Sequence, residues 1–234
     1  MKPTKKTGYS NWHLFHFGRE FVTKNQPLPD YFGKSYNNCY IMFADFTNFT
    51  TFFSASDNLE DIEPILQDYY TKARHVIHQH HGMLDKILGD GFLAVWGLHD
   101  KSCDIENCLA KCVVELNELS LNVAKRWQKI IDIHVEETGM SFGLAKGRLI
   151  TIRRNKTLPG LSILGNSINM AARLEKEAGS GELMCSNKAH SGLAKLNLNF
   201  KENPTETDIK GFGNVKSFKI DINDIKNGLQ KNCC

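Results

Sequence analysis

Two aspartates stand at tight turns beside apolar segments, and their carboxylates are the side chains in this sequence best suited to chemistry. Asp45 ends the apolar run NNCYIMFAD, and Asp90 lies between two glycines in KILGDGFLAVWG, residues 86–97. Two strand-end carboxylates of this kind can hold a pair of hard cations through oxygen ligands. The turn after Asp45 can also offer backbone N–H groups to phosphates. Either motif alone is an ordinary turn, so the prediction depends on the pair.

A second candidate pair is Asn169 and Arg173, which are four residues apart in INMAARLEKEA and so share one face of an expected helix. The small residues Ala171 and Ala172 between them allow a ligand to approach closely. A planar guanidinium can bind phosphate oxygens through two hydrogen bonds. Taken alone, the pair is better explained as a solvated helix face on which Arg173 pairs with Glu177.

The spacing of apolar residues predicts the elements that position these side chains. Residues 59–81 have helical spacing and stop at Gly82. Residues 83–97 are expected to form a hairpin around Asp90, and residues 102–128 a second helix. The segments MSFGLAKG and RLITI that follow are typical of two strands.

A third helix is expected through INMAARLEKEA, with Asn166 or Ser167 as its cap and Gly179 at its end. The segment KGFGNVKSFKI is typical of a closing hairpin. This order of elements predicts an α+β fold. The specific expectation is the ferredoxin-like βαββαβ arrangement, an antiparallel sheet with helices on one face.

The composition is that of an ordinary globular protein and argues against several classes of function. The 234 residues carry a net charge of +3 and are 41% hydrophobic, so charge predicts neither nucleic acid nor a membrane surface as a partner. No apolar run approaches the roughly 20 residues that cross a bilayer, and no signal peptide is expected. The seven cysteines form no CxxC pair, which favours a reducing, cytoplasmic setting.

Three motifs together resemble the catalytic domain of class III nucleotide cyclases. They are FADFTNFT, LDKILGDGFLAVWG and LGNSINMAARLE, in the order and spacing of that family. The resemblance covers residues 37–222 and implies an N-terminal extension and linker at residues 1–36 and a C-terminal tail at residues 223–234. It implies closure of the ribose 3′-hydroxyl of a nucleoside triphosphate onto its α-phosphate, with release of pyrophosphate.

The resemblance also implies a role for each matching residue. Two divalent cations, Mn²⁺ or Mg²⁺, are expected on Asp45, on the backbone carbonyl of Phe46 and on Asp90. The expected substrate contacts of the turn after the first aspartate are Phe46, Thr47, Asn48 and Phe49. The remaining expected roles are ribose orientation by Asn169, stabilisation of charge on the α-phosphate by Arg173, triphosphate binding by Lys210, and base recognition by Lys86 and Ser162.

Family members form dimers in which one subunit supplies the metal ligands and the other supplies the base and transition-state residues. This single chain carries both sets. The resemblance therefore implies a homodimer with two equivalent composite sites.

The base is not determined by these residues. A lysine such as Lys86 can donate to N1 of adenine or to a pyrimidine, at O2 of either base or at N3 of cytosine, and the Ser162 hydroxyl can donate or accept. Guanylate cyclases usually have an acidic residue at the Lys86 position, so GTP is disfavoured. The domain resembles the stand-alone bacterial pyrimidine cyclases of antiphage defence, whose cyclic UMP or CMP is detected by a separate effector. It also resembles simple bacterial adenylate cyclases that make cyclic AMP.

Three departures from the family pattern favour an unusual branch, and hence a non-standard base. Asn48 replaces the glycine usual after the first aspartate, and Ile152 and Asn155 stand where the family often has glycines. Other classes fit less well. A catalytically inactive nucleotide-binding regulatory domain would usually have lost one of the four key residues. A diguanylate cyclase or polymerase palm would need a GGDEF-like turn, and a pure interaction module leaves the aligned motifs unexplained.

Overall fold

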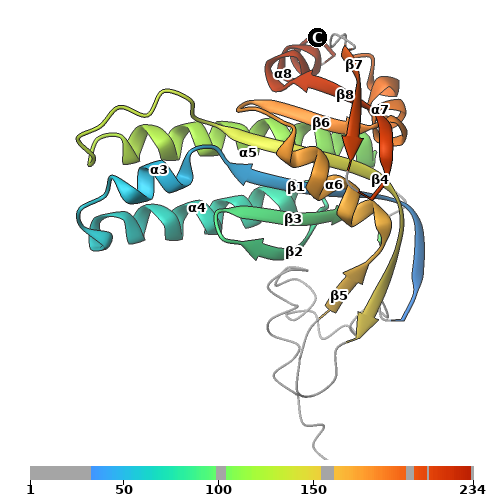
Figure 1. Ribbon diagram of the computed structural model, residues 1–234, viewed down its shortest axis with the longest axis horizontal. Helices are drawn as coiled ribbons and strands as arrows, with labels where there is room; N and C mark the ends of the chain where they lie inside the picture. The colour runs from blue at the N-terminus through green and yellow to red at the C-terminus, as the bar shows by residue number, and fades with distance from the viewer. Residues whose placement is uncertain (1–32, 99–103, 154–160, 199–202, 210, 233–234) are drawn as a thin grey trace, which may run out of the picture.

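The computed structural model describes residues 33–98, 104–153, 161–198, 203–209 and 211–232. Within these residues the chain forms one eight-stranded sheet with the order β2-β3-β1-β4-β6-β8-β7, and β5 pairs with β4 (Figure 1). The strands are β1 (Ser35–Phe46), β2 (Met83–Leu88), β3 (Gly91–Trp96), β4 (Met140–Arg153), β5 (Leu161–Leu164), β6 (Glu182–Ser186), β7 (Asn203–Ile209) and β8 (Gly213–Asp221). The helices are α3 (Phe49–Ser54), α4 (Leu59–Gln79), α5 (Ile105–Trp127), α6 (Asn166–Lys176), α7 (Asn187–Leu193), the short η1 (Ala194–Leu196) and α8 (Ile222–Lys231).

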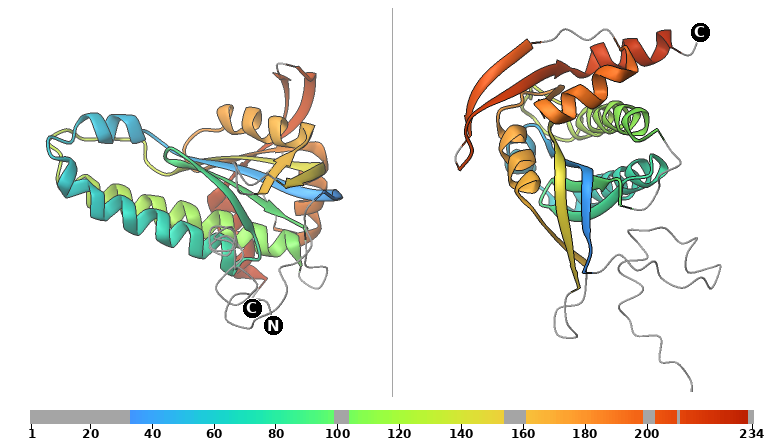
Figure 2. Two further views of the ribbon diagram at one scale, coloured as in Figure 1. Left: turned by 90° about the horizontal axis from the view of Figure 1, so that it is seen from below. Right: turned by 90° about the vertical axis from the view of Figure 1, so that its right-hand side faces the viewer.

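The first part of the chain forms a ferredoxin-like unit. Strands β2, β3, β1 and β4 are neighbours in that order, and each neighbouring pair is antiparallel. The long helices α4 and α5 lie side by side on one face of these strands (Figure 2). The α+β class and the βαββαβ order predicted from the sequence are therefore confirmed. Beyond this unit, β6 joins β4 as a parallel neighbour.

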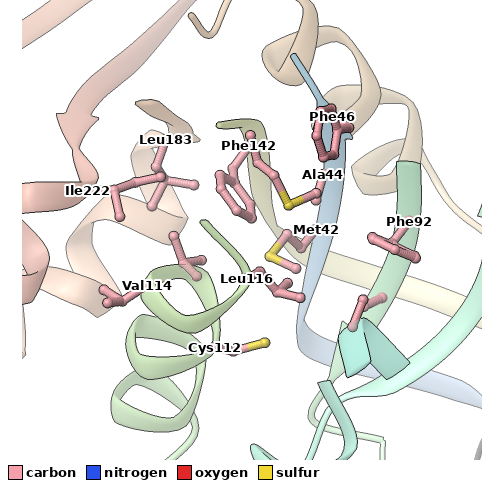
Figure 3. Packing of buried hydrophobic residues seen from close by; sticks show 14 of the residues in the cluster. Met42, Ala44, Phe46, Phe92, Cys112, Val114, Leu116, Phe142, Leu183 and Ile222 are labelled. Atoms are coloured by element: carbon pink, nitrogen blue, oxygen red, sulfur yellow. The ribbon is translucent and has the colours of Figure 1, made fainter. Parts of the chain in front are cut away.

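Alternation along β1 divides its side chains between two cores on opposite faces of the sheet. Met42, Ala44 and Phe46 pack into the large core beneath α4 and α5, as Figure 3 shows. Ile41 belongs to a smaller core, which includes Ala171 of α6 on the other face. Asp45 alternates with Ala44 and Phe46, so its carboxylate lies on the α6 face rather than in the large core.

Helix α6 packs unusually close to the sheet. A Cβ atom at Gly143 of β4 would overlap the carbonyl oxygen of Ala171 and the amide nitrogen of Glu175. A Cβ atom at Gly147, also in β4, would overlap the hydroxyl of Ser167. The glycines of MSFGLAKG are therefore contact points for α6, and we expect larger side chains at either position to displace the helix.

Several elements differ from the sequence-based expectations. Strand β4 is one continuous strand where two were expected, because Gly147 accommodates α6 and does not end the strand. Helix α3 was not anticipated. Helix α6 begins after Gly165, with no side-chain cap from Asn166 or Ser167. The segment expected to be a C-terminal tail contains α8, which places Ile225 in the large core.

Two further expectations concern the setting of the chain. None of the helices among the described residues combines the length and apolar character needed to cross a bilayer. The cysteines at positions 39, 108, 112 and 185 are free thiols, and three of them are buried. Cys112 packs inside the large core, as expected for a small apolar residue rather than a metal ligand.

Candidate active site

Asp90 occupies the two-residue turn that joins β2 to β3. Gly89, the first turn residue, has a φ of 65°, which is the conformation that a hairpin turn beginning with glycine requires. Two tyrosine hydroxyls of α4 donate hydrogen bonds to this turn, Tyr69 to the Asp90 carbonyl at 3.1 Å and Tyr70 to the Gly89 carbonyl at 3.0 Å. These two hydrogen bonds fix the backbone that carries the Asp90 carboxylate to α4.

Gly91 explains why a second glycine follows Asp90. A Cβ atom at Gly91 would lie 2.7 Å from the Asp45 carboxylate oxygen Oδ1 and 2.6 Å from the Ala44 carbonyl oxygen. Only glycine leaves room for the Asp45 side chain to lie across the start of β3. The turn therefore brings Asp90 next to the carboxylate of Asp45, which comes from a segment 45 residues earlier in the chain.

Without a cation, the charged forms of these two carboxylates are disfavoured, because the pKa of each is raised. Burial raises the pKa of Asp45 from 3.8 to about 7, with further contributions from the charges of Asp90 and Glu175. Burial also raises the pKa of Asp90. Acidic groups that share a desolvated site disfavour simultaneous ionisation, so a bound cation would relieve both effects.

The donor set around these carboxylates fits hard divalent cations. Both side chains offer oxygen ligands, which Mg²⁺ and Mn²⁺ prefer. The hydroxyl oxygen of Thr47, two residues after Asp45, is buried and has no hydrogen-bond partner among the described residues. An orphaned buried hydroxyl at this turn is what a site completed by a ligand would leave. The residues present therefore fit the cation binding expected from the sequence.

The loop after Asp45 explains one departure from the family pattern. Asn48 has a φ of 61°, a left-handed conformation that glycine adopts freely and asparagine tolerates better than most residues. Its side-chain Nδ2 donates to the Glu137 carbonyl at 2.9 Å, and the Thr47 amide donates to the Gly139 carbonyl at 3.0 Å. The asparagine thus preserves the backbone turn and ties it to the chain before β4.

The raised pKa of Asp45 predicts how stability depends on pH. Between pH 3.8 and about 7 the folded, cation-free protein keeps a proton that the unfolded chain releases. The contribution of Asp45 to the free energy of unfolding therefore falls as the pH rises through this window. Urea denaturation in EDTA should show that the wild type loses stability relative to Asp45→Asn between about pH 4 and pH 8. Mn²⁺ should restore stability to the wild type at the higher pH, and a constant difference between the two proteins without metal would contradict this prediction.

The second half of the expected site lies on α6. Asn169 and Arg173 are both exposed and line the same pocket, which has a volume of about 610 Å³. The other lining residues are Asn166, Ala172, Lys176, Gly211 and Phe212. The structure thus brings Asn169 and Arg173 together, but Asp45 and Asp90 are not part of this pocket.

The residues expected to bind the base and the triphosphate are only partly described. Lys86 lies in β2 opposite Leu93 of β3, with its ammonium nitrogen 2.6 Å from the carboxylate of Asp85. Ser162 lies in β5 opposite Ile152 of β4. Lys210 lies outside the described residues, although its neighbour Gly211 lines the Arg173 pocket.

Glu175 is a further carboxylate at this site, and no motif in the sequence indicated it. It accepts a hydrogen bond of 2.7 Å from the hydroxyl of Ser141, the residue paired with Asp45 across β1 and β4. Among the described residues no three acidic, histidine or cysteine side chains are close enough to hold one ion. The charge of Glu175 nevertheless contributes to the raised pKa of Asp45. Helical spacing could have indicated its position. Glu175 follows the buried Ala171 by four residues, so both lie on the face of α6 that packs against the sheet.

Comparison with known proteins decides the family. A model of the adenylate and guanylate cyclase catalytic domain family matches residues 32–221, most of the chain. The chain belongs to this family. The match includes both aspartates and the Asn169–Arg173 pair, so the resemblance inferred from the three motifs is confirmed. As a member, the domain is a nucleotide cyclase domain of the adenylate and guanylate type, a family that uses divalent cations in catalysis.

The curated relatives include both guanylate cyclases and an adenylate cyclase. The chain is 26% identical over 178 residues to the receptor-type guanylate cyclase gcy-7 of Caenorhabditis elegans, covering 76% of this chain and 16% of that protein. It is 23% identical over 186 residues to the germination-specific adenylate cyclase of Dictyostelium discoideum, covering 79% and 21%. The cyclase domain thus spans about a fifth or less of these longer proteins.

A solved cyclase has the same fold. The adenylyl cyclase CyaB from P. aeruginosa superposes with a TM-score of 0.69 at 17% identity, covering 80% of this chain and 95% of that chain. At this identity the likeness concerns the fold alone. It shows that the mixed sheet and its helices are those of a cyclase catalytic domain.

Proposed function

We propose that this cyclase domain converts a nucleoside triphosphate to a 3′,5′-cyclic nucleotide and pyrophosphate by two-metal catalysis. The new bond joins the ribose 3′-oxygen to the α-phosphorus, the bond from the α-phosphorus to the β-phosphate oxygen breaks, and the 3′-hydroxyl loses its proton. The observation that carries this proposal is the pair of desolvated carboxylates, Asp45 and Asp90, brought together across Gly91.

One half of the site binds the cations and the phosphates. Asp45, the Phe46 carbonyl and Asp90 would hold two divalent cations, Mn²⁺ or Mg²⁺. When bound, such cations lower the pKa of the 3′-hydroxyl and neutralise charge on the phosphates. The turn formed by residues 46–49 would contact the phosphates, and its backbone is already fixed by the bonds of Thr47 and Asn48 to the chain before β4.

The other half of the site would come from a second copy of the chain. Arg173 would stabilise charge on the α-phosphate, Asn169 would orient the ribose and Lys210 would bind the triphosphate. Separation of the Arg173 pocket from the aspartates supports a composite site. The β4–β5 hairpin also presents three exposed apolar side chains on neighbouring positions, at Ile150, Ile152 and Leu164, which a homodimer could cover.

For the base, we propose adenine or a pyrimidine ahead of guanine. Lys86 and Ser162 would recognise it, and the Lys86 ammonium can only donate hydrogen bonds. It can therefore donate to N1 of adenine, to O2 or N3 of cytosine, or to O2 of uracil, whose N3 carries a hydrogen and is itself a donor. Cyclic UMP or CMP as product would match the stand-alone cyclases of antiphage defence, whose product acts on a separate effector, whereas cyclic AMP would match a conventional signalling enzyme.

The test is an assay of all four substrates. The purified protein is incubated with Mn²⁺ and ATP, GTP, CTP or UTP in separate reactions, and the products are identified by mass spectrometry. We expect one preferred cyclic nucleotide, released with an equal amount of pyrophosphate, and none with the Asp45→Asn variant. Binding of nucleotide without any cyclic product would contradict the proposal and favour a regulatory nucleotide-binding domain.

A further inference from the structure

A buried carboxylate lies directly beside the lysine that we propose recognises the base. The side chain of Asp85 is 2% exposed, whereas that of Lys86 is 34% exposed. The Lys86 ammonium donates to Asp85 Oδ2 at 2.6 Å. Asp85 is not among the cation or phosphate ligands proposed above, and its burial keeps it from direct contact with a substrate.

An irregularity in β2 makes this ion pair possible. Successive side chains of a regular strand point to opposite faces, so sequence neighbours such as Asp85 and Lys86 would not normally meet. Here Leu84 pairs with Ala94 of β3, and Lys86 pairs with the next residue, Leu93. Asp85 is therefore the extra residue of a β-bulge, which re-aims the side chains around it.

The bulge also sets the face on which Lys86 lies. Leu93, its partner across the strands, packs in the smaller core with Ile41 of β1. This is the face of the sheet that carries Asp45 and α6. Without the extra residue, Lys86 would lie on the face beneath α4 and α5. The bulge thus places Lys86 where a nucleotide can reach it.

Burial makes Asp85 a rigid partner. A carboxylate removed from water is costly unless hydrogen bonds and a counter-charge compensate it, and the Lys86 ammonium contributes one hydrogen bond and a positive charge. A lysine on a free surface has a flexible four-carbon stem and little directional preference. Here one N–H is engaged with Asp85, which leaves two donors in a restricted position for a ligand.

We propose that Asp85 is a positioning residue for base selection, which fixes the point from which Lys86 donates to a ring acceptor of the nucleobase. The inference rests on the proposed role of Lys86 in the cyclase site. It predicts that removing the Asp85 charge changes the preference among bases and leaves the binding of phosphates intact. A purely structural role for Asp85 would affect both alike.

The experiment measures binding, so it does not depend on turnover. Calorimetry in Mn²⁺ compares the 3′-deoxy triphosphates of adenosine, cytidine, uridine and guanosine, which cannot cyclise, with inorganic tripolyphosphate, which has no base. For Asp85→Asn we expect about a tenfold or greater loss for the preferred nucleotide, a smaller spread among the four bases and unchanged tripolyphosphate binding. In a Lys86→Met background, Asp85→Asn should cause no further loss, because the two residues act as one unit.

A second variant covers the case in which Asp85→Asn does not fold. Asp85→Glu keeps the charge and the ion pair but moves the ammonium, so we expect an altered ranking of the bases with unchanged tripolyphosphate binding. An unchanged ranking in both folded variants would overturn the inference, as would an equal loss for nucleotide and tripolyphosphate. Wild-type protein that binds all four nucleotides equally would overturn it too. Failure of cyclisation with retained base preference would count against the proposed function alone.

Discussion

Replacing Asp45 by Asn is expected to abolish cyclisation while the domain remains folded. The substitution keeps the size of the side chain over Gly91 but removes one of two carboxylates that would hold the cations. Loss of one cation ligand should cost about 4 kcal/mol of transition-state stabilisation, or about a thousandfold in kcat. Asp90→Asn should have an effect of the same order. The measurement is the initial rate with the preferred nucleotide at saturating Mn²⁺.

The matched control for Asp45→Asn is Asp57→Asn, which removes the same charge from an exposed position. It should cyclise at the wild-type rate. Because Asp45 is destabilised by burial and by neighbouring charges, Asp45→Asn should also be at least as stable as the cation-free wild type at neutral pH. Substantial turnover by the folded Asp45→Asn variant would refute the two-metal proposal.

Arg173→Ala is the second substitution with a large expected effect. The guanidinium is exposed and lies in a pocket without a cation-binding carboxylate, so its removal should leave the fold and cation binding unchanged. A contact that strengthens in the transition state lowers kcat more than it raises KM. We expect a loss of about a thousandfold in kcat. Arg173→Lys should recover only part of it, because the ammonium lacks the planar fork. A change confined to KM would contradict this role.

Mixing the two inactive proteins tests whether the site is shared between subunits. In a heterodimer of Asp45→Asn with Arg173→Ala, one site carries both substitutions and the other carries neither. After subunit exchange of an equal mixture, half of the dimers are mixed, and about a quarter of the wild-type activity should return. No recovery, with exchange confirmed by a tag on one variant, would show that each chain builds its own complete site.

Much of the site was predictable from local pattern. The run that ends at Asp45 and the glycines around Asp90 identified two strand ends, and the turn chemistry of Gly89 followed from its type. The four-residue spacing of Asn169 and Arg173 placed them together on α6 and in one pocket. These features depend on short-range geometry, in which each residue type has few alternatives, so sequence alone was sufficient.

Other features depend on contacts between segments far apart in the sequence. Asn48 departs from the family pattern, yet the turn survives because its side chain binds the Glu137 carbonyl. Gly147 suggested the end of a strand, but it is the point at which Ser167 meets β4. Glu175 gained significance only when packing of α6 brought it to Ser141. No local propensity encodes such approaches, because each is set by the partner element.

The sequence by itself determined the family and the ferredoxin-like order of elements, and it indicated the residue types of the proposed two-cation site, since these follow from motif and periodicity. Only the tertiary structure decided that Asp45 lies across Gly91, that the Arg173 pocket excludes the aspartates, and that Lys86 is bound to a buried Asp85. The physical reason is strand pairing. One extra residue in β2 re-aims every side chain after it, and that register exists only once β3 is in place.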